Sequence, residues 1–151
     1  MKFNLRARLT AEFVGSAFLV AAVVGSGIMG ERLASGNVAI ALLANTIATG
    51  AVLVALILTF GPISGAHLNP AVTVADAIEH GIAWPEALAY IAVQCVGGVA
   101  GAILAHLMFG LRWYSFSTHS RRGWSLVLSE FVATFGLPER PDHHRSRFAD
   151  R

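Results

Sequence analysis

Three long apolar stretches, separated by short polar segments, dominate the pattern of this chain. They predict helices over residues 9–30, 38–60 and 87–111. A helix of about twenty residues rises far enough, at about 1.5 Å per residue, to cross the hydrocarbon core of a membrane. No Lys, Arg, Asp or Glu occurs from Leu33 to Ala75. The pattern therefore predicts an all-α membrane protein with three transmembrane helices.

A segment at residues 61–80 interrupts the apolar pattern. Gly61 and Pro62 are unfavourable inside a helix, so we expect the second helix to end before them. Asn69 followed by Pro70 is typical of a helix start. Together these signals predict a re-entrant loop and half-helix, although an ordinary loop between two spans is the alternative. Non-helical backbone at membrane depth is tolerated inside protein or beside a watery cavity, where its free polar groups often form a binding or conduction site.

The composition agrees with a membrane location. Of the 151 residues, 55% are hydrophobic and 13% are charged, whereas soluble domains carry about 25% charged residues. The net charge of +2 is small, and no cluster of Lys and Arg suggests a nucleic-acid partner. Cys95 is the single cysteine, so the chain can form no internal disulfide, and we interpret Cys95 as a small core residue.

The block Ser-Gly-Ala-His-Leu-Asn-Pro-Ala-Val-Thr at residues 64–73 carries a family resemblance. It resembles the first signature loop of the aquaporin and aquaglyceroporin, or major intrinsic protein, family, and the resemblance extends over roughly Leu9 to Leu111. It implies a channel for passive transport of water and small uncharged solutes such as glycerol. It also implies a multi-pass protein of the cell membrane, expected in a bacterial inner membrane, with no enzymatic activity, no cofactor and no metal site.

The resemblance further implies which residues line the conduction path. The Asn side chain of the motif would donate a hydrogen bond to a passing oxygen, and the main-chain carbonyls before it would replace lost hydration. The family's selectivity arginine belongs to a second signature loop. In the first loop, at residues 64–73, the matching position is Val72, so no charged filter residue is carried over. The expected motif residues are Asn69, Pro70 and Ala71, and the expected carbonyls are those of Gly65, Ala66, His67 and Leu68.

Two further positions acquire roles by the same resemblance. Glu12 is an acid within the first apolar span, a costly location that suggests function, and the matching acid of the family braces a re-entrant loop. The alternative is that Glu12 meets water at the membrane interface. Thr49 matches a position of the family's narrow selectivity ring, where a small residue would suit solute-permeable members and some bacterial members linked to arsenic resistance. The alternative for Thr49 is a packing role.

The end of the chain contains an incomplete repeat. Ala11-Glu12-Phe13-Val14 recurs approximately as Ser129-Glu130-Phe131-Val132, the sign of an inverted repeat. We therefore expect a first repeat at residues 1–123 and a truncated second repeat at 124–137, whose short fourth helix cannot cross a membrane. We interpret residues 138–151 as a polar, disordered tail, a composition that a frameshift or an early stop would also produce. Its adjacent histidines are too few to predict a metal site.

One repeat amounts to half of a pore, which leaves three hypotheses. Two copies in opposite orientations could pair into a channel, or copies could assemble into the tetramer usual for the family. A non-conducting remnant or membrane-embedded assembly partner is the alternative. A membrane enzyme has no support, because no set of nucleophile, base and orienting group is evident. Basic residues flank both ends of the spans, so they fix no single orientation; they are Lys2, Arg6, Arg8, Arg32, Arg112, Arg121 and Arg122.

Overall fold

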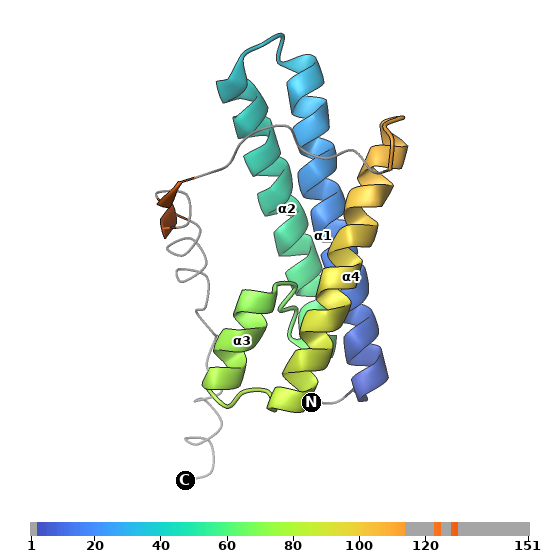
Figure 1. Ribbon diagram of the computed structural model, residues 1–151, viewed down its shortest axis with the longest axis vertical. Helices are drawn as coiled ribbons and strands as arrows, with labels where there is room; N and C mark the ends of the chain where they lie inside the picture. Colours follow the sequence, from blue (N-terminus) through green and yellow to red (C-terminus); the bar gives the residue numbers. More distant parts are fainter. Residues whose placement is uncertain (1–2, 114–122, 125–127, 130–151) are drawn as a thin grey trace. The chain divides into compact units, whose positions relative to one another are not determined.

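A computed structural model describes residues 3–113, 123–124 and 128–129 of the chain. Three helices in this part are long and apolar enough to cross a membrane, α1 (Leu5–Leu33), α2 (Val38–Ser64) and α4 (Trp84–Met108). A short helix, α3 (Pro70–Ile78), lies between α2 and α4 in sequence and runs beside α4 (Figure 1). The predicted all-α fold of three spans and a half-helix is confirmed.

Helices α1 to α4 belong to one compact unit, Met1–Ser117, and a second unit comprises Thr118–Arg151. Most of the predicted truncated repeat at 124–137 and all of the predicted tail at 138–151 lie outside the described residues. The boundary expected at residue 123 therefore stays a prediction.

Three of the helices begin at an asparagine. The side chain of Asn4 accepts a hydrogen bond from the amide of Ala7 at 2.9 Å at the start of α1. Asn37 and Asn69 cap α2 and α3 in the same way. An asparagine at this position satisfies amides that have no partner within the helix. The start of the half-helix at Asn69 is therefore confirmed.

The expected end of α2 before Gly61 is wrong, because the helix continues through Pro62 to Ser64. Proline costs one helical hydrogen bond, but it stands only two residues before the helix end. The last turn still closes, since the amide of Gly65 donates to the carbonyl of Gly61 at 3.0 Å. A buried hydrogen bond from Ser64 to Glu12 at 2.6 Å also holds this turn in place. The break in the chain thus starts at Gly65.

Helix α1 packs against both α2 and α4, and bare glycines permit the closest approach. A Cβ atom on Gly97 of α4 would come within 2.5 Å of the carbonyl oxygen of Phe13, and one on Gly101 would overlap the carbonyl oxygen of Ala17. Small residues allow helices to approach closely in membranes, where apolar side chains gain little by leaving lipid. The Gly97–Gly101 pair therefore sets the distance between α1 and α4.

Polarity is distributed inside out relative to a soluble protein. Glu12, Ser64 and Thr73 are fully buried, and Gln94 is 3% exposed. Large apolar side chains cover the outside of α2, where Leu42, Ile47 and Leu58 are each more than 60% exposed. This distribution suits a lipid environment, in which polar groups gather in the bundle interior.

We predict that Gly101→Ala destabilises the bundle by about 1–3 kcal/mol, the usual cost of overpacking, because the added methyl overlaps the backbone of α1. Gly50→Ala is the matched control, since nothing lies within 4 Å of a Cβ at Gly50. That substitution should be neutral or slightly stabilising because alanine favours helices. Thermal unfolding in detergent measures both variants, and equal stability of the two would contradict the packing described above.

Candidate functional site

The loop between α2 and α3 consists of residues 65–69 and has an unusual backbone. Gly65, Ala66 and Leu68 all have positive φ angles, of 93°, 48° and 50°. Glycine adopts such angles readily, whereas alanine and leucine do so at a cost. Residues in this conformation persist where the surrounding contacts hold them, often at functional sites. The contacts that hold this loop come mainly from one side chain.

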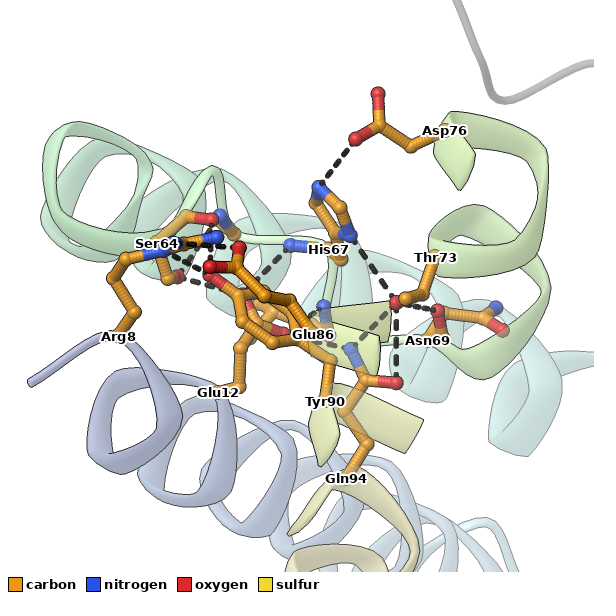
Figure 2. Close-up of polar contacts among 12 residues, drawn as sticks. Arg8, Glu12, Ser64, His67, Asn69, Thr73, Asp76, Glu86, Tyr90 and Gln94 are labelled. Carbon is orange, nitrogen blue, oxygen red and sulfur yellow. Dashed lines mark hydrogen bonds and ion pairs between the residues drawn. The ribbon is translucent and has the colours of Figure 1, made fainter. Parts of the chain in front are cut away.

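That side chain is Glu12 of α1, whose carboxyl group accepts four hydrogen bonds (Figure 2). Oε1 accepts from Ser64 Oγ at 2.6 Å and from the amide of His67 at 3.0 Å. Oε2 accepts from the amide of Leu68 and from Gln94 Nε2, both at 2.8 Å. Glu12 is fully buried, so its carboxyl group is not exposed to water, in contrast to the alternative of an interfacial acid. Glu12 joins the end of α2, the loop and α4 to α1.

These bonds also determine how the loop carbonyls are oriented. The amides of Ala66, His67 and Leu68 donate to Ser64 Oγ or to Glu12. The loop contains no cis peptide, and in a trans peptide the carbonyl points opposite to the amide of the next residue. The carbonyl groups of Gly65, Ala66 and His67 therefore point away from their brace. Within the described residues, those of Gly65 and Ala66 accept no hydrogen bond.

The half-helix α3 presents its N-terminal end beside the loop. Asn69 Oδ1 accepts from the amide of Ala71 at 2.8 Å, with Pro70 in the first turn. In the part of the chain that the structure describes, Asn69 Nδ2 donates to no other atom. The hydroxyl of Thr73 lies 3.1 Å from the carbonyl oxygen of Asn69 and 2.9 Å from Gln94 Nε2. The capping residue is thus fixed while its amide donor stays available.

The ring of His67 connects the loop to α3 and α4. Its Nδ1 lies 3.1 Å from Thr73 Oγ1, and its Nε2 lies 3.6 Å from Asp76 Oδ2. The ring also packs against that of Tyr90, with centroids 5.3 Å apart. Thr73 and Asp76 lie three residues apart on the same side of α3, so one imidazole meets both. The ring thereby holds the half-helix against the loop.

A second chain of contacts closes the same end of the bundle. Arg8 donates to the hydroxyl of Tyr90 at 2.8 Å and forms an ion pair with Glu86 at 2.9 Å. Tyr90 donates in turn to the carbonyl of Ser64 at 3.0 Å. This carbonyl belongs to the last turn of α2, where a helix leaves acceptors without partners. Arg8 and Tyr90 therefore stabilise the point where the loop departs.

The structure brings together most residues that the sequence nominated, namely Glu12, Gly65, Ala66, His67, Leu68, Asn69, Pro70 and Ala71. Thr49 lies elsewhere on α2, and its hydroxyl donates to Asn45 at 3.0 Å. Sequence reasoning gave Arg8, Tyr90 and Gln94 no role in this site. Tyr90 and Gln94 stand four residues apart in an uncharged span, a spacing that places both on one helix face and could have indicated a shared function.

Comparison with known proteins agrees with this geometry. The sequence profile of the family described as Major intrinsic protein matches residues 1–139. Aquaglyceroporin AqpS of Rhizobium meliloti (strain 1021) is 49% identical over 136 residues, which cover 90% of this chain and 58% of that protein. Probable aquaporin PIP2-8 of Oryza sativa subsp. japonica is 35% identical over 143 residues, covering 90% of this chain and 51% of the relative.

A shorter similarity involves the glycerol uptake facilitator protein of Bacillus subtilis (strain 168). It is 39% identical over 89 residues, covering 51% of this chain and 32% of that protein. The chain thus spans about half the length of the curated relatives that it matches over most of its own residues.

We predict that Glu12→Gln loosens the loop. Both carboxyl oxygens of Glu12 accept hydrogen bonds, whereas a carboxamide has only one acceptor oxygen. Losing a buried partner costs about 1–3 kcal/mol, so hydrogen exchange at the amides of His67 and Leu68 should accelerate by about 10- to 100-fold. Glu31→Gln, at an exposed acid near the end of α1, should leave both rates unchanged. Exchange measured by mass spectrometry tests this, and unaltered protection in Glu12→Gln would refute the bracing role.

Proposed function

The chain belongs to the major intrinsic protein family, the family of aquaporins and aquaglyceroporins, and we propose that it supplies one half of a pore for water and small uncharged solutes. It is a multi-pass membrane protein, and its described residues include three helices long and apolar enough to span a membrane. The single observation that carries the proposal is the orientation of the loop. Glu12 binds the amides of His67 and Leu68 and thereby turns the preceding carbonyls away from itself.

The carbonyls of the loop require a polar neighbour. Those of Gly65 and Ala66 accept no hydrogen bond within the described residues. A backbone acceptor without a partner is costly in lipid, and irregular backbone persists there only inside protein or beside water. A file of water or hydroxyl groups would satisfy these oxygens, and they in turn would replace the hydration that a solute loses. These carbonyls, with that of His67, form the proposed acceptor row.

Asn69 would supply the complementary donor. Its Oδ1 is occupied by the amide of Ala71, which leaves Nδ2 free to donate to an oxygen on the path. The N-terminal end of α3 adds a partial positive charge at the same point. Such an end disfavours cations and protons while it tolerates neutral molecules. Pro70 and Ala71 complete the proposed motif by starting the half-helix at this position.

The proposal requires a second half. Helix α3 has nine residues and therefore a length of about 14 Å at 1.5 Å per residue, about half of a hydrocarbon core. A continuous path needs a second half-helix facing the first, which a copy inserted in the opposite orientation would supply. Thr49 is the proposed selectivity position, where a small side chain would leave room for solutes larger than water.

Asn69→Asp tests this function. Aspartate keeps the oxygen that caps α3 but removes the free donor. Water permeability should therefore fall by about tenfold or more, a larger change than the loss of one net hydrogen bond would produce. Asn37→Asp makes the same change at the exposed cap of α2 and should leave permeability unchanged. Stopped-flow shrinkage of proteoliposomes measures both variants against the unchanged chain.

The unchanged chain provides the decisive comparison. Permeability to water and glycerol above that of protein-free vesicles supports the half-pore, and cross-linking in the same vesicles should detect paired copies. Flux equal to that of the lipid alone would refute conduction by this chain and would leave a membrane-embedded assembly partner as its function.

A further inference from the structure

A second polar cluster lies between α1 and α2 and, among the residues that the structure describes, shares no hydrogen bond with the Glu12 network. It consists of Ser26, Asn45 and Thr49. Asn45 Oδ1 accepts from Thr49 Oγ1 at 3.0 Å and lies 3.2 Å from Ser26 Oγ. The serine has a single hydroxyl proton and a shorter contact, of 2.6 Å, to the carbonyl of Ala22. Thr49 is therefore the main donor to the asparagine.

The bond of Thr49 is exceptional among the threonines of α2. Thr46 and Thr59 donate to the main-chain carbonyls of Leu42 and Ala55, four residues earlier, each at 2.8 Å. This back-bonding is the common arrangement for threonine in a helix. Thr49 instead donates to the side-chain oxygen of Asn45. The carboxamide of Asn45 therefore determines the orientation of the Thr49 hydroxyl.

Helix α1 provides the space that Asn45 needs. A Cβ atom on Gly27 would lie 3.2 Å from Asn45 Nδ2, and one on Gly30 would lie 3.0 Å from the carbonyl oxygen of Ala41. The two glycines let α2 approach closely here, and the bare Gly27 leaves room for the carboxamide. The side chain of Asn45 is thereby held beside α1, with its oxygen toward Thr49.

The pair retains unused hydrogen-bonding capacity. Within the described residues, Thr49 Oγ1 accepts no hydrogen bond and Asn45 Nδ2 donates none, and both side chains are only partly buried. In a span without charged residues, such groups face the bundle interior or a water-filled cavity rather than lipid. The oxygen of Thr49, as an acceptor, matches a solute hydroxyl, which donates one hydrogen bond.

We propose that Asn45 is a positioning residue of the solute path: it accepts the hydrogen bond of the Thr49 hydroxyl and so leaves the threonine oxygen oriented to accept a hydrogen bond from a hydroxyl of a small polyol. This inference rests on the proposed function of Thr49. It names the chemical class that the position selects and the residue that prepares it.

The hydrogen bond is tested without any flux measurement. The chain has four asparagines, Asn4, Asn37, Asn45 and Asn69, so side-chain amide spectra of asparagine-labelled protein in detergent contain few signals. Asn45→Ala identifies the signal of Asn45. Thr49→Val should shift that signal. Thr46→Val, the same substitution three residues before Thr49, should leave the signal in place. An unshifted signal in Thr49→Val would overturn the proposal.

The role in selection is tested by the ratio of glycerol to water permeability in proteoliposomes. Asn45→Ala and Thr49→Val should each lower this ratio by about fivefold, the equivalent of one net hydrogen bond. Because one residue acts through the other, the double variant should be no worse than Thr49→Val alone. Thr46→Val should keep the original ratio. Thr49→Ser retains the hydroxyl, so in that background Asn45→Ala should again lower the ratio, whereas in the Thr49→Val background it should not.

Two failures are distinguishable. Additive effects of Asn45→Ala and Thr49→Val, or a ratio that ignores Asn45→Ala while flux persists, would overturn this inference and leave the channel intact. Absence of flux in the unchanged chain would overturn the proposed function and the solute role together, and the amide spectra would then report on the contact alone.

Discussion

The binding of four hydrogen-bond donors by the carboxyl group of Glu12 is the interaction on which the rest of the structure depends. The loop after α2 has lost helical hydrogen bonding, and its amides need partners that a lipid environment does not supply. Glu12 offers two oxygens at one point, so successive amides can converge on them. The positive φ angles of Ala66 and Leu68 are the local cost of that convergence.

Close helix packing and the polar core support each other. Gly97 and Gly101 bring the backbone of α4 against α1, and this proximity lets Gln94 reach Glu12 at 2.8 Å. Gly15 contributes from the other side, because a Cβ atom there would overlap the side chain of Leu68. In lipid, such interlocking backbone contacts and internal hydrogen bonds replace the hydrophobic effect as the source of helix association.

Much of the fold could be predicted from the sequence because its signals are local. The length of the apolar stretches indicated the three spans, and Asn69-Pro70 indicated the start of the half-helix. The extension of α2 through Pro62 could not be predicted, since it depends on a contact between Ser64 and Glu12 across 52 residues. Local propensity favours a break at this proline, and a tertiary hydrogen bond overrides it.

The candidate site was predictable to a similar degree. The family resemblance indicated Glu12 and the loop, but the partners on α4 depend on which helices pack together, and no pattern along the chain reveals that pairing. Gln94 is 82 residues from Glu12. The bond between Asn45 and Thr49 is different, because their spacing of four residues places them on one helix face, and the sequence alone could have suggested it.

The location of Gln94 has a consequence for biogenesis. Ser64, His67 and Leu68 leave the ribosome before α4 does, so an early intermediate can offer Glu12 only three of its four donors. Tyr90, which bonds the carbonyl of Ser64, arrives equally late. The loop at residues 65–69 therefore reaches its final shape only when α4 enters the bilayer, so the membrane insertion of α4 also completes the site.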